Sequence, residues 1–119
     1  MTGVLRPRVT LASALVAILL ATAAPAFAQG SRCIQEAASI HRAEAQLPKL
    51  EVAPPDDQQI VCITLETNIL FARRMAAHLA HCPRSPYTRA AESWERTGAQ
   101  YTAQFSDRHC KPAIRPFRG

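Results

Sequence analysis

Two histidines and a cysteine lie within the stretch HLAHC at residues 78–82, and a second His-Cys pair occurs at His109-Cys110. Imidazole nitrogens and cysteine thiolates are common ligands of transition metals. Residues three positions apart share one face of a helix, so His78 and His81 could hold one ion together. The simpler interpretation is that both histidines serve a helix end, where they complement the helix dipole.

The cysteines determine which metal ligands remain available. The sequence contains four cysteines, Cys33, Cys62, Cys82 and Cys110. An even number is typical of two disulfides when a short chain is exported. The spacing contains no Cys-x-x-Cys pair, which disfavours a redox dithiol or a paired-thiolate zinc site. If the disulfides form, only histidines and carboxylates are left as ligands.

A metal site normally requires a third protein ligand, and Glu36 is the candidate. Glu36 lies one helical turn from Cys33, as His78 lies one turn from Cys82. A disulfide between those cysteines would bring Glu36 beside the two histidines. We therefore expect no cofactor on the simpler interpretation, and a divalent transition-metal ion held by His78, His81 and Glu36 on the alternative one.

The first 28 residues resemble a secretory signal peptide. Two arginines precede an apolar stretch, and AFA at residues 26–28 supplies the small residues that a signal peptidase requires, with cleavage before Gln29. An uncleaved membrane anchor is the competing interpretation, because the apolar stretch is long enough to span a bilayer. Pro25 and the cleavage site disfavour it. We expect a periplasmic or secreted protein.

Removal of residues 1–28 leaves twelve Lys and Arg against nine Asp and Glu, a net charge of +3. All of this excess lies in the tail 111–119, so the domain 29–110 is balanced and gives no indication of nucleic-acid binding. The tail is expected to be a flexible, solvated terminus. A weak, salt-sensitive contact with an anionic membrane is the alternative, through Lys111, Arg115, Phe117 and Arg118.

Three amphipathic segments separated by prolines must position these residues. They cover residues 31–47, residues 58–81 and a third stretch that starts at Ser85-Pro86, a typical pair of helix-start residues. The middle segment is apolar around much of its circumference, which suits a helix with neighbours on two sides. A strand at residues 60–64 is the alternative for its β-branched run. The pattern predicts an all-α fold, a small antiparallel three-helix bundle.

An up-down-up arrangement of these helices limits the disulfide pairing. Cys62 and Cys82 are about 30 Å apart along one helix, far beyond the span of a disulfide. The antiparallel layout instead favours Cys33–Cys82 and Cys62–Cys110. The pairing Cys33–Cys62 with Cys82–Cys110 remains open, because the linker between the first two helices could return along the first one.

No catalytic signature is present in the sequence. Phosphate-binding glycine loops and hydrolase or metalloprotease motifs are absent, and no spacing places a nucleophile beside a base. The sequence also has no motif of a family that we recognise. By elimination, we expect a small exported non-enzymatic binding protein of the cell envelope, with an unknown envelope partner or ligand. The metal-binding and membrane-attachment hypotheses are the alternatives.

Overall fold

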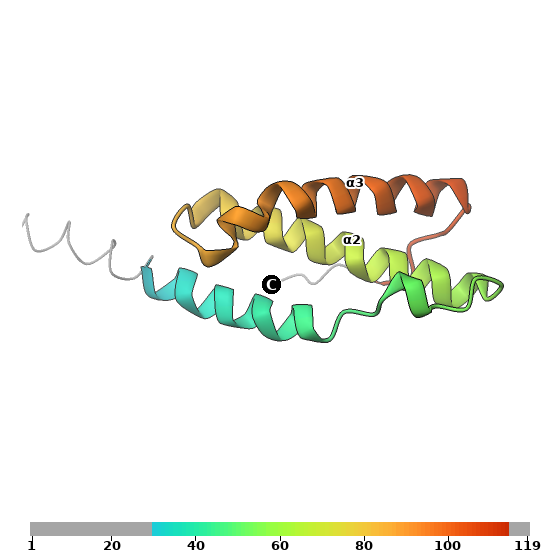
Figure 1. Cartoon of the computed structure of the whole chain (residues 1–119), viewed down its shortest axis with the longest axis horizontal. Helices are drawn as coiled ribbons and strands as arrows, with labels where there is room; N and C mark the ends of the chain where they lie inside the picture. The colour runs from blue at the N-terminus through green and yellow to red at the C-terminus, as the bar shows by residue number, and fades with distance from the viewer. Residues whose placement is uncertain (1–29, 115–119) are drawn as a thin grey trace, which may run out of the picture. The chain divides into compact units, whose positions relative to one another are not determined.

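The structure is a computed structural model that describes residues 30–114, and these residues form helices and loops without strands (Figure 1). The predicted signal peptide and its cleavage before Gln29 lie outside the described residues. Three helices and two short 3-10 turns follow one another: the first helix (residues 30–45), η1 (Leu50–Val52), α2 (Gln58–His81), η2 (Pro86–Ala90) and α3 (Ala91–Asp107).

Within residues 33–114, α2 lies between the first helix and α3 and runs antiparallel to both (Figure 1). It provides most of the buried side chains, including Val61, Leu65 and Ile69. A core cluster joins Phe71 and Met75 of α2 to Ile40 of the first helix. The partly buried residues packed against this cluster are Ala43, Leu47, Leu79, Tyr87 and Trp94. The prediction of a small all-α bundle with a central middle helix is confirmed.

The start of α2 follows from its local sequence. Asp57 is the N-cap residue, and its side chain accepts a hydrogen bond of 3.2 Å from the backbone N–H of Ile60, which satisfies one of the free amides of the first turn. The β-branched run at residues 60–64 is helical, so the strand alternative is wrong. The burial of Val61 and Thr64 in the bundle outweighs the β-propensity of this run. Ile60, at the start of this run, is 43% exposed.

The third helical segment begins at the expected residues. Ser85 accepts a hydrogen bond from the Tyr87 backbone N–H, and Pro86 occupies the first position of η2. Gly98 allows α3 to approach α2 closely, since a Cβ atom there would stand 3.0 Å from the Cβ of Ala72. No residue of α3 is fully buried, and its aromatic residues Trp94, Tyr101 and Phe105 are only partly covered. Trp94 meets the core through Phe71, with ring centroids 4.7 Å apart.

Two disulfides join the helices in the pairing that the antiparallel layout favours. Cys33 is bonded to Cys82, with Cα atoms 5.7 Å apart, and Cys62 is bonded to Cys110, with Cα atoms 5.5 Å apart. No free cysteine remains in the described residues. Such bonds persist in oxidising compartments, so the location is extracytoplasmic. None of the helices in residues 30–114 combines the length and apolar character needed to span a bilayer.

The end of α3 forms a Schellman motif. The backbone N–H of Cys110 donates to the carbonyl of Phe105, and that of His109 donates to the carbonyl of Ser106. His109 adopts the left-handed conformation, with φ of 55°. Beyond this turn, the chain comes back to α2, where the buried Glu66 carboxylate accepts hydrogen bonds from the backbone of residues 113–114. The first part of the predicted tail is therefore held in place.

Candidate metal centre

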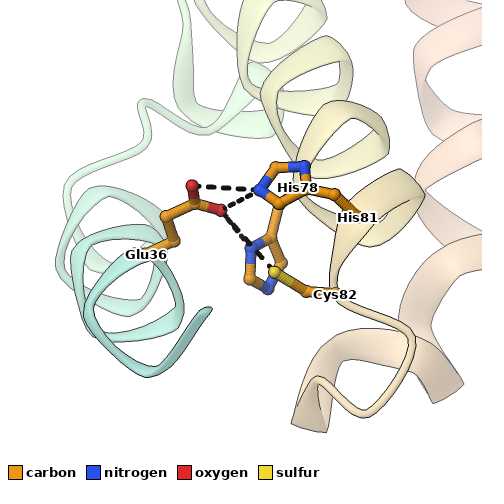
Figure 2. A group of neighbouring side chains, drawn as sticks. All are labelled: Glu36, His78, His81 and Cys82. Atoms are coloured by element: carbon orange, nitrogen blue, oxygen red, sulfur yellow. Dashed lines mark hydrogen bonds and ion pairs between the residues drawn. The ribbon is translucent and has the colours of Figure 1, made fainter. Parts of the chain in front are cut away.

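The candidate site lies where the first helix meets the end of α2. The Cys33–Cys82 disulfide fixes the two elements to each other at this point. One turn along the first helix, Glu36 points toward α2, and one turn back from Cys82, His78 points toward the first helix (Figure 2). His81 completes the group from the last position of α2. The structure thus brings together all three residues proposed as metal ligands, in the way that the disulfide pairing requires.

One carboxylate contacts both imidazole rings. Oε2 of Glu36 lies 2.9 Å from Nδ1 of His78 and 2.7 Å from Nε2 of His81, and Oε1 lies 3.0 Å from the same Nε2 (Figure 2). The rings stand nearly perpendicular, with an interplanar angle of 82° and centroids 6.0 Å apart. An ionised carboxylate can only accept hydrogen bonds, so each of these nitrogens bears a proton when Glu36 is charged.

Burial decreases across the site from one side to the other. The side chain of His78 is 2% exposed, that of Glu36 is 28% exposed and that of His81 is 46% exposed. His78 is therefore held by the core, whereas His81 faces solvent. The cluster therefore has one candidate ligand buried in the core and one at the surface, on the side open to solvent.

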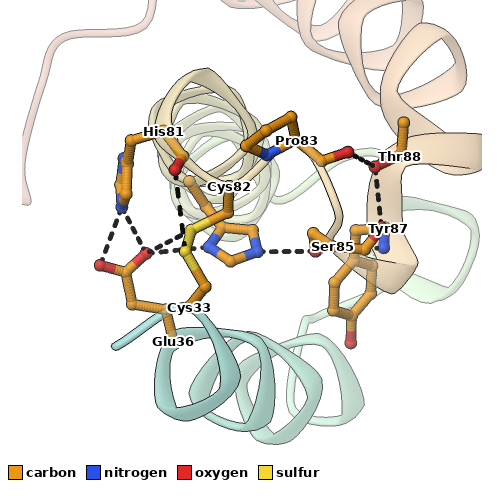
Figure 3. The surroundings of a disulfide bond; sticks show 9 residues. Cys33, Glu36, His81, Cys82, Pro83, Ser85, Tyr87 and Thr88 are labelled. Atoms are coloured by element: carbon orange, nitrogen blue, oxygen red, sulfur yellow. Dashed lines mark hydrogen bonds and ion pairs between the residues drawn. A yellow bond between two sulfur atoms is a disulfide. The ribbon is translucent and has the colours of Figure 1, made fainter. Parts of the chain in front are cut away.

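Ser85 holds the far side of the buried imidazole. Its Oγ lies 2.7 Å from Nε2 of His78, in the loop beside the disulfide (Figure 3). The same Oγ accepts the backbone N–H of Tyr87 at 3.2 Å. Because a hydroxyl group both donates and accepts, Ser85 can pair with either tautomer of His78. Burial raises the pKa of the Tyr87 phenol, and the charge of Glu44 raises it further, so the Tyr87 side chain stays neutral.

The separations of these atoms suit a small divalent ion. Zn²⁺ binds nitrogen and oxygen ligands at about 2.0 Å, which in a tetrahedron places them about 3.3 Å from one another. The ligand atoms of Glu36, His78, His81 and Cys82 all lie within 4.8 Å of one another. To admit an ion in place of the two imidazole protons, the separations of 2.7 and 2.9 Å from the shared carboxylate oxygen would have to widen by about 0.4–0.6 Å. A pair of ligand atoms at the 4.8 Å limit would have to approach by about 1.5 Å. Cys82 is not a ligand while its sulfur is in the disulfide.

The chain from Glu36 through His78 to Ser85 also has the order of a carboxylate–imidazole–hydroxyl catalytic relay. A hydrolase would further require oxyanion donors and substrate space beside the hydroxyl group. The recess at this site borders Glu36 and the two histidines but does not reach Ser85. The Ser85 hydroxyl is also engaged as a helix cap. We therefore interpret Ser85 as a residue that positions His78.

The other candidate residues lie away from this cluster. His109 follows α3 next to the second disulfide, at the opposite end of α2, and is not part of the group. Lys111 is exposed. The remaining residues proposed for membrane contact lie outside the described residues: Arg115, Phe117 and Arg118.

Two contributors to the site were missed by sequence reasoning. Ser85 was identified only as a helix-start residue, yet the loop between α2 and η2 brings it back to His78, seven positions earlier. Arg74 lies one turn before His78 and donates a hydrogen bond to the Ser39 hydroxyl of the first helix. Its position, i−4 from a candidate ligand on the same helix face, was a usable signal.

Comparisons of the chain with protein-family models, with curated proteins and with solved structures found no match.

Proposed function

We propose that this protein is a small exported binding protein of the cell envelope whose ligand is a divalent first-row transition-metal ion, held by Glu36, His78 and His81. The observation that supports the proposal is the convergence of two imidazole nitrogens on one carboxylate, within 2.7–2.9 Å of a shared oxygen. The periplasmic or secreted location rests on the signal-peptide pattern of residues 1–28, together with the two disulfides.

The alternative explanation, two histidines that only complement a helix dipole, does not require a partner on another helix. Here both rings reach across to the same residue of the first helix. A charge at a helix end gains its stabilisation from the helix itself, and an exposed side chain would suffice. The burial of His78, with both ring nitrogens occupied, is instead typical of a ligand whose second nitrogen is fixed by an outer partner.

The donor set favours a particular class of ion. Imidazole suits Zn²⁺, Cu²⁺, Ni²⁺ and Fe²⁺, whereas a site for Ca²⁺ or Mg²⁺ would present mostly oxygen atoms. A set of two histidines and one glutamate also leaves a coordination position open. Zn²⁺ is therefore a suitable first probe.

The proposal is tested by isothermal titration of Zn²⁺ into untagged, disulfide-bonded protein, with native mass spectrometry as a count of bound ions. We expect one ion per chain. His78→Ala and Glu36→Gln should each weaken binding by more than about 100-fold, because even outer partners of metal ligands contribute about 10- to 100-fold. Ser85→Ala should fall within that smaller range.

Two matched controls use histidines outside the cluster. His41→Ala, on the exposed face of the first helix, and His109→Ala should leave Zn²⁺ affinity unchanged. Circular dichroism of each variant would establish that the helices remain. Absence of a stoichiometric ion in the wild-type protein, or equal affinity of the ligand variants and the controls, would overturn the proposal and leave the cluster as a structural polar contact.

A further inference from the structure

The contact between the first helix and α2 consists of three successive layers. The Cys33–Cys82 disulfide forms the first layer, Glu36 with His78 forms the second, and Ser39 with Arg74 forms the third. Each layer is about one helical turn from the next on both helices. A guanidinium group therefore lies directly beside the candidate metal ligands.

A recess of about 220 Å³ opens between the second and third layers. It is lined by two apolar residues and by four that can bind ions or polar groups: Ile40, Ala77, Glu36, Arg74, His78 and His81. One water molecule accounts for about 30 Å³ of liquid volume, so the recess has room for a small polyatomic ligand. Its floor at Ile40 is 1% exposed, which closes it toward the core.

The charges around this recess favour an anion once a metal is bound. A divalent ion supplies two positive charges, Arg74 supplies a third, and the Glu36 carboxylate offsets one of them. The two histidines would then be neutral ligands. Two positive charges would remain, facing a partly closed space where electrostatic attraction is less screened than in bulk water.

The hydrogen-bonding groups agree with this charge balance. Three protein ligands leave at least one position on the metal for an outside atom. A guanidinium group has five N–H donors in a planar fork that matches the oxygen atoms of carboxylates and phosphates. In the described residues, the interaction of Arg74 is a donation from Nη2 to the Ser39 hydroxyl, which leaves further donors for a ligand.

We propose that the metal-loaded site binds a small oxyanion in this recess, with one oxygen on the metal and another on the Arg74 guanidinium. This inference rests on the metal-binding function proposed above. The protein would then recognise a metal–oxyanion pair rather than a bare ion. Free phosphate and small carboxylates share the required chemistry, two or more oxygen atoms around one centre, and the experiment separates them.

Co²⁺ is a suitable probe, because its visible spectrum responds to a change of coordinating atoms. The Co²⁺-loaded protein would be titrated separately with acetate and with inorganic phosphate. We expect a saturable spectral change with at least one of them, and the anion that gives tighter binding identifies the class. Arg74→Gln should weaken that binding about tenfold or more, since hydrogen bonds to charged groups are the strong ones.

Three control variants separate recognition by Arg74 from other roles of the residue. Arg73→Gln removes the same charge from the next position of α2, where the side chain borders a different groove. Ser39→Ala removes the bond between Arg74 and the first helix but keeps the guanidinium. Both should bind the anion as the wild type does. Arg74→Lys keeps the charge without the planar fork and should give an intermediate loss.

The outcomes distinguish the two proposals. If Co²⁺ binds stoichiometrically but neither anion changes its spectrum, the oxyanion site is overturned and the metal site stands. Equal losses for Arg74→Gln and Arg73→Gln would also overturn it, because they would indicate only a general charge effect. If neither Co²⁺ nor Zn²⁺ binds, both proposals fail.

Discussion

The two ends of α2 contain the same parts in different arrangements. Each end has a disulfide in which one cysteine directly follows a histidine, in the pairs His81-Cys82 and His109-Cys110. At each end a glutamate also lies about one turn after the other cysteine of that disulfide. Glu36 contacts two imidazole rings, whereas Glu66 accepts hydrogen bonds of 2.8–3.1 Å from backbone amides of residues 113–114. An imidazole can exchange its proton for a metal ion, but a backbone amide remains a hydrogen-bond donor.

The difference shows that the residues in contact with a His-Cys pair determine what the histidine can do. The first pair faces Glu36 on the first helix across the disulfide. The second pair ends α3, and its histidine is used as a left-handed cap residue. One end of α2 is thus the candidate ion site, and the other holds residues 113–114 against α2.

Removal of each disulfide in turn gives the largest expected effect and tests this comparison directly. Each bond closes a loop of 48 or 49 residues, so its loss should lower the free energy of unfolding by up to about 4 kcal/mol. The two double variants should differ in their Zn²⁺ binding. Cys33→Ala with Cys82→Ala frees the helix that holds Glu36 and should abolish Zn²⁺ binding, whereas Cys62→Ala with Cys110→Ala should preserve it.

Denaturant unfolding measures the first quantity and calorimetric titration measures the second, under conditions where circular dichroism shows both variants to be helical. Equal Zn²⁺ affinity in the two variants would contradict the view that the Cys33–Cys82 bond positions the site.

The fold was predictable because it depends on patterns that repeat along the chain. Apolar spacing and proline positions indicated three helices, and the 20-residue separation of Cys62 and Cys82 excluded their pairing. Glu36 could be named as a partner of His78 because each lies one turn from a cysteine of the same predicted disulfide.

The rest depended on contacts that have no sequence period. Ser85 reaches His78 because of the path of the short loop that begins at Pro83. A hydrogen bond from the Ser85 backbone N–H to the Cys82 carbonyl fixes this loop. The anchoring of Ala113 on Glu66 joins residues 47 positions apart. A glutamate within a largely apolar helix was a signal of a buried partner, but the sequence did not identify that partner.

Glu66→Gln should produce the next largest effect, and only on stability. The side chain is 7% exposed and accepts three hydrogen bonds, which its charge strengthens. We expect the free energy of unfolding to fall by about 2 kcal/mol, since the neutral amide offers one acceptor oxygen in place of two. Zn²⁺ affinity should not change.

Glu92→Gln is the matched control for this substitution. Glu92 is 83% exposed and forms an ion pair of 4.0 Å with Arg96, so its replacement should alter the free energy of unfolding by less than about 0.5 kcal/mol. A loss of Zn²⁺ affinity in Glu66→Gln would mean that the two ends of α2 are not independent. Equal stability of the two variants would mean that the hydrogen bonds to Glu66 do not stabilise the fold.

His109→Gly should produce the smallest effect and the opposite sign. His109 has φ of 55°, a conformation that glycine adopts without the steric cost that other residues incur. The substitution should raise the free energy of unfolding by about 0.5–1 kcal/mol in denaturant titrations. His41→Gly, in the middle of the first helix, should lower it by a similar amount, because glycine disfavours a helix interior. A loss of stability in His109→Gly would show that the imidazole makes a stabilising contact there, and the end of α3 would then resemble the end of α2 more closely than its backbone indicates.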